Sequence, residues 1–295
     1  MPTPFAIFCA DPLDPRSVEP DFANEVEPAR STGFNTVRLD HDNLDRRVDP
    51  TSALRKTRFD EAGKAVYRGW MLSTDAYAAL FAELAKRGIF LLTTPEQYTA
   101  CHHAPGSYAQ LAQWMPATAW QQLDELDDAG QRQRILAQFG ASPLVIKDWV
   151  KSQASGYWRE ACYINDASDT VEVDRVVSRF RELQGESIVG GIVFKSYVPL
   201  LPIGGPAHEY RAFIVDGQIV GCWPRSDAAS ALGPPPQHLL QSVAEKLPSP
   251  FASADFGRDT HGRWWLLEVG DGQVSSLPTL DAATAIFNAL AAALR

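Results

Sequence analysis

Three carboxylates near the C-terminus could hold a metal ion. Residues 255–272 predict strand, turn and strand, with the turn at 259–262. Asp255 lies on the first strand and Glu268 ends the second, so antiparallel pairing can bring both together, and Asp271 can extend the cluster. Adjacent carboxylates repel, and oxygen-only ligands suit a hard cation such as Mg²⁺ that also binds phosphates. The alternative is that these acids are ordinary solvated residues near strand ends.

A lysine and a small polar loop could bind phosphates. Lys147 follows the apolar part of a strand predicted at 143–151, and a lysine there can place a point charge on a phosphate. The loop after it contains Ser152, Ser155 and Gly156, and it could fold over phosphates and donate backbone N–H groups. The GxxxxGK[ST] pattern is absent, so this is no Walker A loop. The alternative is a surface loop beside an edge-strand lysine.

Two arginines could bind an anionic group. Glu209 and Arg211 share one face of a strand predicted at 208–215, and Arg225 follows the partner strand across a predicted Asp216-Gly217 hairpin turn. Two guanidinium groups near an acidic metal site favour binding of a phosphate or of a carboxylate that is being activated. The alternative is an ordinary cross-strand salt bridge that includes Glu209.

The strand that ends at Lys195, Tyr197 and Val198 can offer backbone N–H and C=O groups to a purine ring. Other enzyme signatures are missing from the sequence. There is no GxSxG, no HExxH, and no GxGxxG after the first strand.

The elements that must position these residues form two units. The first hundred residues alternate strands with helices at 19–32 and 75–87, which predicts a small α/β unit with a mostly parallel sheet. Residues 101–120 show no clean period and predict a joint. The predicted strands of the first unit are 5–9, 35–40, 66–71 and 89–92.

The remaining chain predicts an α+β unit with antiparallel hairpins and segregated helices. The strong two-residue turn at Asp216-Gly217 indicates one hairpin, and residues 255–272 indicate another. Helices are predicted at 119–139, 173–183, 237–247 and 280–294, and strands at 143–151, 157–163, 190–200, 208–215 and 218–224.

Composition limits the class of protein. The 295 residues have a formal net charge of −9, which argues against bulk nucleic-acid binding. A small basic group at 55–58 could still form a local groove that binds nucleic acid, although a solvated loop is the simpler interpretation. The four cysteines form no CxxC pair and favour reduced thiols in a cytoplasmic protein. We find neither a signal peptide nor an apolar run that could span a membrane.

The order of these motifs along the chain resembles that of an ATP-grasp enzyme: a strand lysine, a small polar loop, a hinge, two strand arginines and then two carboxylates. The resemblance covers roughly residues 119–295, with an N-lobe at about 119–194 and a C-lobe at about 195–295, and residues 1–118 resemble the pre-ATP-grasp α/β domain. Phrases near 67–71 and 268–274 resemble a bacterial and phage clade noted for two arginines and a lysine. The resemblance implies ATP and Mg²⁺ as cofactors, held by two α+β lobes.

The resemblance also implies roles for individual residues. Lys147 would contact the α- and β-phosphates with the loop of Ser152, Ser155 and Gly156, and Lys195, Tyr197 and Val198 would hold adenine. Asp255 and Glu268 would bind Mg²⁺. Arg211 and Arg225 would steady the oxygens of an acyl phosphate. Independently of the resemblance, Arg68 at a predicted strand end could face the ATP cleft, so we expect Arg68 and Trp70 on the substrate side, although Arg68 could equally pair structurally.

By this resemblance the protein activates a carboxylate, on a small molecule or a peptide, as an acyl phosphate that an amine, a thiol or a similar nucleophile attacks. Two departures stand out. The usual Glu-x-Asn pattern has Gly270 at the Asn position, with Asp271 one residue further on, and the usual first lysine has no match between Ala104 and Gln138. Two alternatives stay open: a nucleic-acid end-joining ligase in which Lys147 becomes lysyl-AMP, and a non-catalytic nucleotide-binding or partner-binding module.

Overall fold

The computed structural model describes residues 3–150, 154–202, 207–226, 229–230 and 233–295. The chain forms two compact units, and neither is one continuous segment. Unit 1 comprises Met1–Cys101, Glu209–Asp255 and Val269–Arg295, and unit 2 comprises His102–His208 and Phe256–Glu268. The predicted boundary at residue 118 falls inside unit 2. The assignment of separate functions to residues 1–118 and 119–295 stays a proposal.

A parallel sheet begins unit 1, as the sequence predicts. Its strand order is β2-β1-β3-β4, and every described pairing in it is parallel. The central strand β1 is buried along its whole length, which is typical of a parallel strand covered on both faces. The strands are β1 (Phe5–Cys9), β2 (Asn35–Leu39), β3 (Gly63–Arg68) and β4 (Ile89–Leu91).

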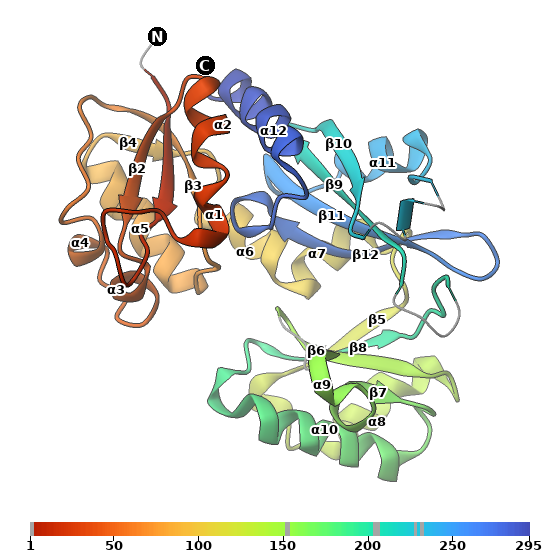
Figure 1. Ribbon diagram of the computed structural model, residues 1–295. Coiled ribbons are helices and arrows are strands. Elements are labelled where there is room, and N and C mark those ends of the chain that lie inside the picture. Colours follow the sequence, from red (N-terminus) through yellow and green to blue (C-terminus); the bar gives the residue numbers. More distant parts are fainter. Residues whose placement is uncertain (1–2, 151–153, 203–206, 227–228, 231–232) are drawn as a thin grey trace. The chain divides into compact units, whose positions relative to one another are not determined.

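Helices cover both faces of this sheet (Figure 1). On one face Tyr77, Leu80 and Leu84 of helix α5 (Thr74–Lys86) pack on the side chains of alternate β1 residues. On the other face Phe8 of β1 shares a core with Ile286 of helix α12 (Leu280–Ala293). The same core continues to the second sheet through Phe213 and Phe251, so α12 links the two sheets of unit 1.

The second sheet has the order β10-β9-β11-β12, with strands β9 (Glu209–Val215), β10 (Gln218–Pro224), β11 (Phe251–Arg258) and β12 (Trp264–Asp271). Both predicted hairpins are confirmed. Asp216 and Gly217 have φ angles of 49° and 70°, as a type I′ turn requires. In the second hairpin the Asp259 carboxylate accepts hydrogen bonds from the backbone N–H groups of His261 and Arg263, which closes the turn between β11 and β12.

An antiparallel sheet forms unit 2, with the order β5-β8-β6-β7. Its strands are β5 (Thr118–Gln122), β6 (Leu144–Asp148), β7 (Tyr163–Ile164) and β8 (Gly191–Ser196). Helices α8 (Ala129–Leu136) and α10 (Thr170–Gln184) pack on one face of this sheet, where Ile146 and Phe194 meet Val176 and Phe180. The antiparallel sheet with segregated helices is the α+β arrangement that the sequence predicts.

Two element predictions in unit 2 were wrong. The helix predicted at 119–139 is a strand, β5, followed by short helices, because residues 118–122 pair with β8 and Asp128 caps a new helix at Ala129. The strand predicted at 157–163 is mostly a π-helical turn, and only Tyr163 and Ile164 pair with β6. The region 101–120, predicted as a joint, contains the whole of helix α7.

The remaining helices are short, and they complete the elements that the structure describes. No described helix is both long and apolar enough to cross a membrane. These helices are α1 (Pro20–Ala23), α2 (Val26–Ser31), α3 (His41–Asp45), α4 (Pro50–Ala53), α6 (Pro95–His102), α7 (Ala104–Leu111), α9 (Ala154–Tyr157), α11 (Gln237–Ala244), the π-helix η3 (Trp158–Cys162), and the 3₁₀ turns η1 (Leu123–Glu125), η2 (Ala137–Phe139), η4 (Gly185–Ser187) and η6 (Gly272–Val274).

Candidate active site

Two lysines lie on the face of the unit 2 sheet that its helices leave open. Lys147 is opposite Val193 in the β6–β8 ladder, and Val145 is opposite Lys195. Opposite residues in an antiparallel pair point to the same face, and every second residue of a strand shares that face. Because Ile146 points into the helix-covered core, Lys147 and Lys195 must both point to the other side.

Both lysines contact strand β12. The ammonium of Lys147 lies 2.5 Å from a carboxylate oxygen of Glu268, and the Lys195 ammonium donates to the main-chain carbonyl of Leu267. The Lys147 side chain is 20% exposed and that of Glu268 is 53% exposed, so solvent reaches this pair. The arrangement brings one predicted phosphate-binding cation against one predicted metal ligand.

A buried aspartate supports the segment after Lys147. Asp148 is fully buried, and its carboxylate accepts hydrogen bonds from the backbone N–H of Val150 at 2.6 Å and of Val189 at 3.3 Å. The Gln184 amide donates to the same carboxylate at 3.1 Å. Asp148 therefore fixes where the chain leaves β6. Sequence reasoning missed this residue, although strand alternation predicts that it points away from the face of Lys147.

The predicted phosphate loop is described only in part. Ser152 lies outside the described residues. Ser155 and Gly156 belong to the short helix α9, and Gly156 is exposed. The role of this loop in binding phosphates therefore stays a prediction.

An aromatic cluster lies at the predicted adenine site. Tyr197 is 37% exposed, and its ring meets Tyr163 edge-on at a centroid distance of 5.2 Å and Trp158 at 6.3 Å. Tyr163 is opposite Val145, so it belongs to the same face as the two lysines. Val198, which follows Tyr197 in the sequence, is half-buried. The sequence did not single out Trp158 or Tyr163, because their segment was misinterpreted as a strand.

In unit 1 both predicted arginines bind one aspartate. Arg211 on β9 donates two hydrogen bonds to Asp255 on β11, each 2.7 Å long, and Arg225 donates a third of 2.7 Å. The Asp255 side chain is 6% exposed, whereas that of Arg225 is 42% exposed. Arg225 is the more exposed of the two arginines, and the Arg211 side chain is 15% exposed. This cluster can therefore attract an anion, and its carboxylate is an oxygen ligand that a hard cation can use.

Asp271 has a different environment from the other two predicted metal ligands. Its carboxylate is fully buried and accepts hydrogen bonds from the backbone and side chain of Gln273 and from the hydroxyl of Ser249. Burial raises the pKa of Asp271 to about 6, against the lowering effect of these hydrogen bonds. Both carboxylate oxygens have protein partners in the core, and we do not include Asp271 in the proposed metal site.

Arg68 is also a core residue, and its contacts match the structural pairing that the sequence left open. Its guanidinium is fully buried and binds the Glu25 carboxylate through Nε and Nη2 at 2.7 and 2.6 Å. The remaining contacts are to the carbonyls of Gly272 and Ser275. Trp70, by contrast, is 44% exposed.

The donor set fits Mg²⁺ with two carboxylates. Among the described residues there is no group of three or more His, Cys, Asp and Glu side chains that could enclose a metal ion. A phosphate-bound Mg²⁺ needs only one or two carboxylates because phosphates and water complete its octahedron. Asp255 of unit 1 and Glu268 of unit 2 each offer a carboxylate of this kind, and their role as metal ligands stays a prediction.

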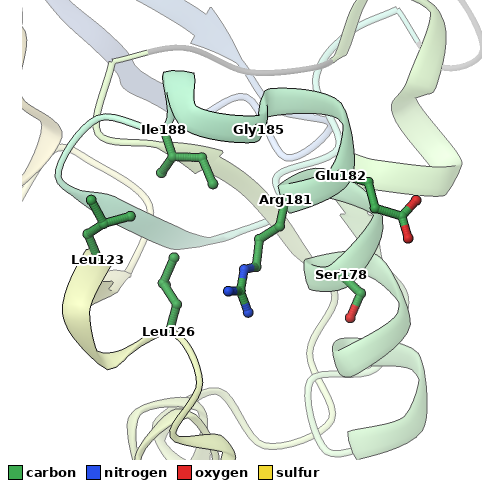
Figure 2. Close-up of a pocket in the computed structure, with 7 residues that line it drawn as sticks. All are labelled: Leu123, Leu126, Ser178, Arg181, Glu182, Gly185 and Ile188. Carbon is green, nitrogen blue, oxygen red and sulfur yellow. The ribbon is translucent and has the colours of Figure 1, made fainter.

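A separate hollow of about 460 Å³ lies in unit 2 (Figure 2). Its side chains come from α10, η1 and the turn after α10, and none of them is a predicted site residue. Arg181 in this hollow pairs with Asp127, and Glu182 pairs with Arg179. The lysine face of unit 2 and the arginine–aspartate cluster of unit 1 are therefore the two candidate sites, each taken by itself. The lining residues in Figure 2 are Leu123, Leu126, Ser178, Arg181, Glu182, Gly185 and Ile188.

Comparisons with known proteins define the class. The fold is that of ATP-grasp proteins: over 97% of this chain and 98% of the other, it matches the crystal structure of a RimK domain protein ATP-grasp from Sphaerobacter thermophilus, with a TM-score of 0.62 and 14% identity. Residues 138–290 match the model of an ATP-grasp domain family, the third family of the clade named for two arginines and a lysine. This match spans more than half of the chain, and the chain belongs to that family.

Other solved structures share the fold. D-cycloserine synthetase DcsG matches with a TM-score of 0.59 and 19% identity, over 99% of this chain and all of that one. The ATP-grasp ligase PsnB, solved with precursor peptide PsnA2 and AMPPNP, matches with a TM-score of 0.59 and 10% identity, over 99% and 97% of the two chains. No curated protein sequence matches the chain. At these identities the structural matches establish the fold alone.

Proposed function

We propose that the protein is an ATP-dependent ligase that activates a carboxylate as an acyl phosphate for attack by an amine or a similar nucleophile. The observation that carries this proposal is the pairing of predicted cations with predicted metal ligands. Lys147 binds Glu268, and Arg211 and Arg225 bind Asp255. Such clusters hold both charges that a magnesium nucleotide needs, cations for its phosphates and carboxylates for its metal.

Each residue has a proposed task. Asp255 and Glu268 would hold Mg²⁺, which neutralises the phosphates when it is bound. Lys147 would bind phosphate oxygens, with Asp148 fixing the chain behind it, and Arg211 and Arg225 would hold the anionic acyl phosphate. Positioned cations are the main protein contribution to phosphoryl transfer, because the transferred group carries its charge on peripheral oxygens.

Lys195, Tyr197 and Val198 would hold the adenine ring. The exposed Tyr197, with Trp158 and Tyr163 beside it, offers an aromatic surface on the face that carries the lysines. Aromatic rings favour stacking on a flat π-system, which a purine provides. The loop with Ser152, Ser155 and Gly156 would close over the phosphates.

The acceptor is proposed by class only. Fold neighbours include a D-cycloserine synthetase and ligases solved with precursor peptides, so a carboxylate on a small molecule or on a peptide fits this fold. The lysyl-AMP alternative has less support, because Lys147 is held in an ion pair with Glu268 and a charged ammonium is no nucleophile. For the ligase we also propose a cytoplasmic location. Its four cysteines are free thiols, which a reducing compartment such as the cytoplasm maintains.

An acceptor screen tests the proposal. The protein is incubated with ATP, Mg²⁺ and separate pools of amino acids, peptides and nucleotides, and released ADP and AMP are measured. We expect one pool to raise ADP output in the wild type and not in Glu268→Ala. A mass gain of one AMP on the intact protein would instead establish the lysyl-AMP mechanism. Tight ATP binding with no ADP release from any pool would establish the non-catalytic alternative.

A further inference from the structure

Unit 1 contains a cavity of about 390 Å³ beside the carboxyl ends of its parallel strands. Residues that follow β1, β2 and β3 all line it, among them Asp11, His41 and Trp70. In the order β2-β1-β3-β4 the chain leaves β1 toward one edge and leaves β3 toward the other, so the strand order reverses between β1 and β3. Open α/β sheets bind ligands in the crevice outside the strand ends at such a switch point.

One carboxylate of the cavity, that of Glu19, has only an electrostatic interaction with a basic side chain among the described residues. Glu19 lines the cavity, and its side chain makes no hydrogen bond and no ion pair with any residue that the structure describes. Burial raises the pKa of Glu19, and the nearby carboxylates of Asp11 and Asp21 raise it further, whereas the nearby His41 acts in the opposite direction. The other acids are occupied: Asp11 accepts from the backbone of Leu13, and Asp40 from Asn43.

The basic side chains that line the cavity form no described ion pair or hydrogen bond with Glu19, because they contact other groups. Arg46 lies 3.8 Å from Asp42, and Arg47 donates to the Asn43 side chain at 3.2 Å. The His41 ring lies 3.4 Å from the carbonyl of Met71. A ligand that enters the cavity therefore meets a carboxylate that no described side chain contacts through a hydrogen bond or an ion pair, whereas both arginines already have partners.

The cavity wall also presents an aromatic ring that the fold holds in place. The Trp70 backbone is fixed by the Tyr67 hydroxyl, which donates to its carbonyl at 2.6 Å, and by the Sγ atom of Cys9, 3.4 Å from its N–H. The preceding Gly69 must be glycine, because a Cβ there would clash with that sulfur atom. The ring packs edge-on against Phe22 and stays 44% exposed.

We propose that this cavity binds a ligand through a primary ammonium group, with Glu19 as its counter-ion and Trp70 as its aromatic wall. A tryptophan face attracts cations more strongly than other aromatic rings do, and a carboxylate gives the ammonium a charge-assisted hydrogen bond. The assignment rests on the proposed ligase function, since an amine is the class of acceptor that consumes an acyl phosphate. The cavity is the amine-acceptor site of that ligase.

Calorimetry without nucleotide tests the assignment. The probes are the amides of the common L-amino acids, each paired with its N-acetyl form, which keeps the side chain and lacks the ammonium. We expect at least one amide to bind the wild type and its acetylated partner not to bind. Glu19→Gln and Trp70→Leu should each weaken that binding about tenfold or more, because they remove a charge-assisted hydrogen bond and a cation–π contact.

Two control variants separate the cavity from general surface effects. Glu27→Gln removes another carboxylate of this unit, and Phe90→Leu removes another exposed aromatic ring, and neither residue lines the cavity. Both should bind the amide as the wild type does. Magnesium-dependent ATP binding should be unchanged in all four variants, and a failure of ATP binding in the wild type would refute the ligase function and not the cavity. The assignment is overturned if no amide binds, or if Glu19→Gln binds it with unchanged affinity.

Discussion

Replacing Lys147 should weaken ATP binding. The loss should be smaller than a full phosphate contact, because the lysine must first give up its ion pair with Glu268. A charged hydrogen bond to a phosphate oxygen contributes about 1.5–3 kcal/mol. In the free protein the ammonium already binds Glu268 at 2.5 Å, and the 53% exposure of that carboxylate puts the pair in the range of surface ion pairs, at most about 1 kcal/mol. The net loss in Lys147→Ala is therefore about 0.5–2 kcal/mol, or about 2- to 30-fold in Kd.

The measurement is calorimetry with AMPPNP and Mg²⁺, which avoids turnover. Lys64→Ala is the matched control, because Lys64 is an exposed lysine of β3 with no predicted role. It should bind the nucleotide as the wild type does. An unchanged Kd in Lys147→Ala would refute the phosphate-binding role of this lysine.

The same ion pair gives a second variant whose effect changes sign with the metal. Without Mg²⁺, Glu268→Gln removes the partner that competes for the Lys147 ammonium, so AMPPNP should bind as tightly as in the wild type or more tightly. With Mg²⁺, the variant lacks a metal ligand and should bind more weakly than the wild type. If Glu268→Gln weakened AMPPNP binding by the same factor with and without Mg²⁺, Lys147 would not exchange Glu268 for a phosphate.

Three further outcomes are expected. Glu268→Ala should abolish ADP formation and leave the thermal unfolding midpoint close to that of the wild type, which an enzyme-coupled assay and calorimetric melting check. Chelation of Mg²⁺ should weaken ATP binding, and equal Kd values with and without a chelator would contradict the two-carboxylate metal site. Because burial raises the pKa of Asp271 to about 6, the folded chain holds that proton more tightly than the unfolded chain, and this group stabilises the fold by up to about 3 kcal/mol more below pH 4 than above pH 6. Asp271→Asn should lose this dependence in denaturant titrations, and pH profiles parallel to the wild type would argue against a buried, titrating Asp271.

Local signals predicted much of the fold. Asp216-Gly217 determines its hairpin because both residues must adopt positive φ, and few other residue pairs do so. The apolar run 5–9 and the amphipathic helix near 75–87 predicted the central strand and a covering helix of the parallel sheet. The failures lie where a partner remote in sequence decides the structure. Residues 118–122 form a strand only because β8 is available to pair with them.

The candidate site shows the same limit at the level of side chains. The sequence identified Lys147, Arg211, Arg225, Asp255 and Glu268 by residue type and by place in the predicted strands. Which cation binds which carboxylate depends on strand order, because β9 and β11 are neighbours in one sheet and residues of their shared face meet. Asp271 was grouped with the metal ligands by its nearness in sequence, and strand alternation places it on the opposite face from Glu268.

The self-pairing of the site explains how charged side chains can be kept ready for a nucleotide at little cost to stability. An unpaired Asp255, 6% exposed on its side chain, would carry a large desolvation penalty, and Arg211 and Arg225 remove it in the absence of metal. Under the proposed function, a magnesium nucleotide would exchange these contacts for its own, since its metal would bind the carboxylates and its phosphates the cations. Metal binding alone would leave Lys147, Arg211 and Arg225 without a counter-charge. Phosphate binding alone would leave Asp255 and Glu268 without one, so each exchange would be unfavourable by itself. Metal and nucleotide should therefore bind cooperatively, and each should raise the affinity for the other by the same factor.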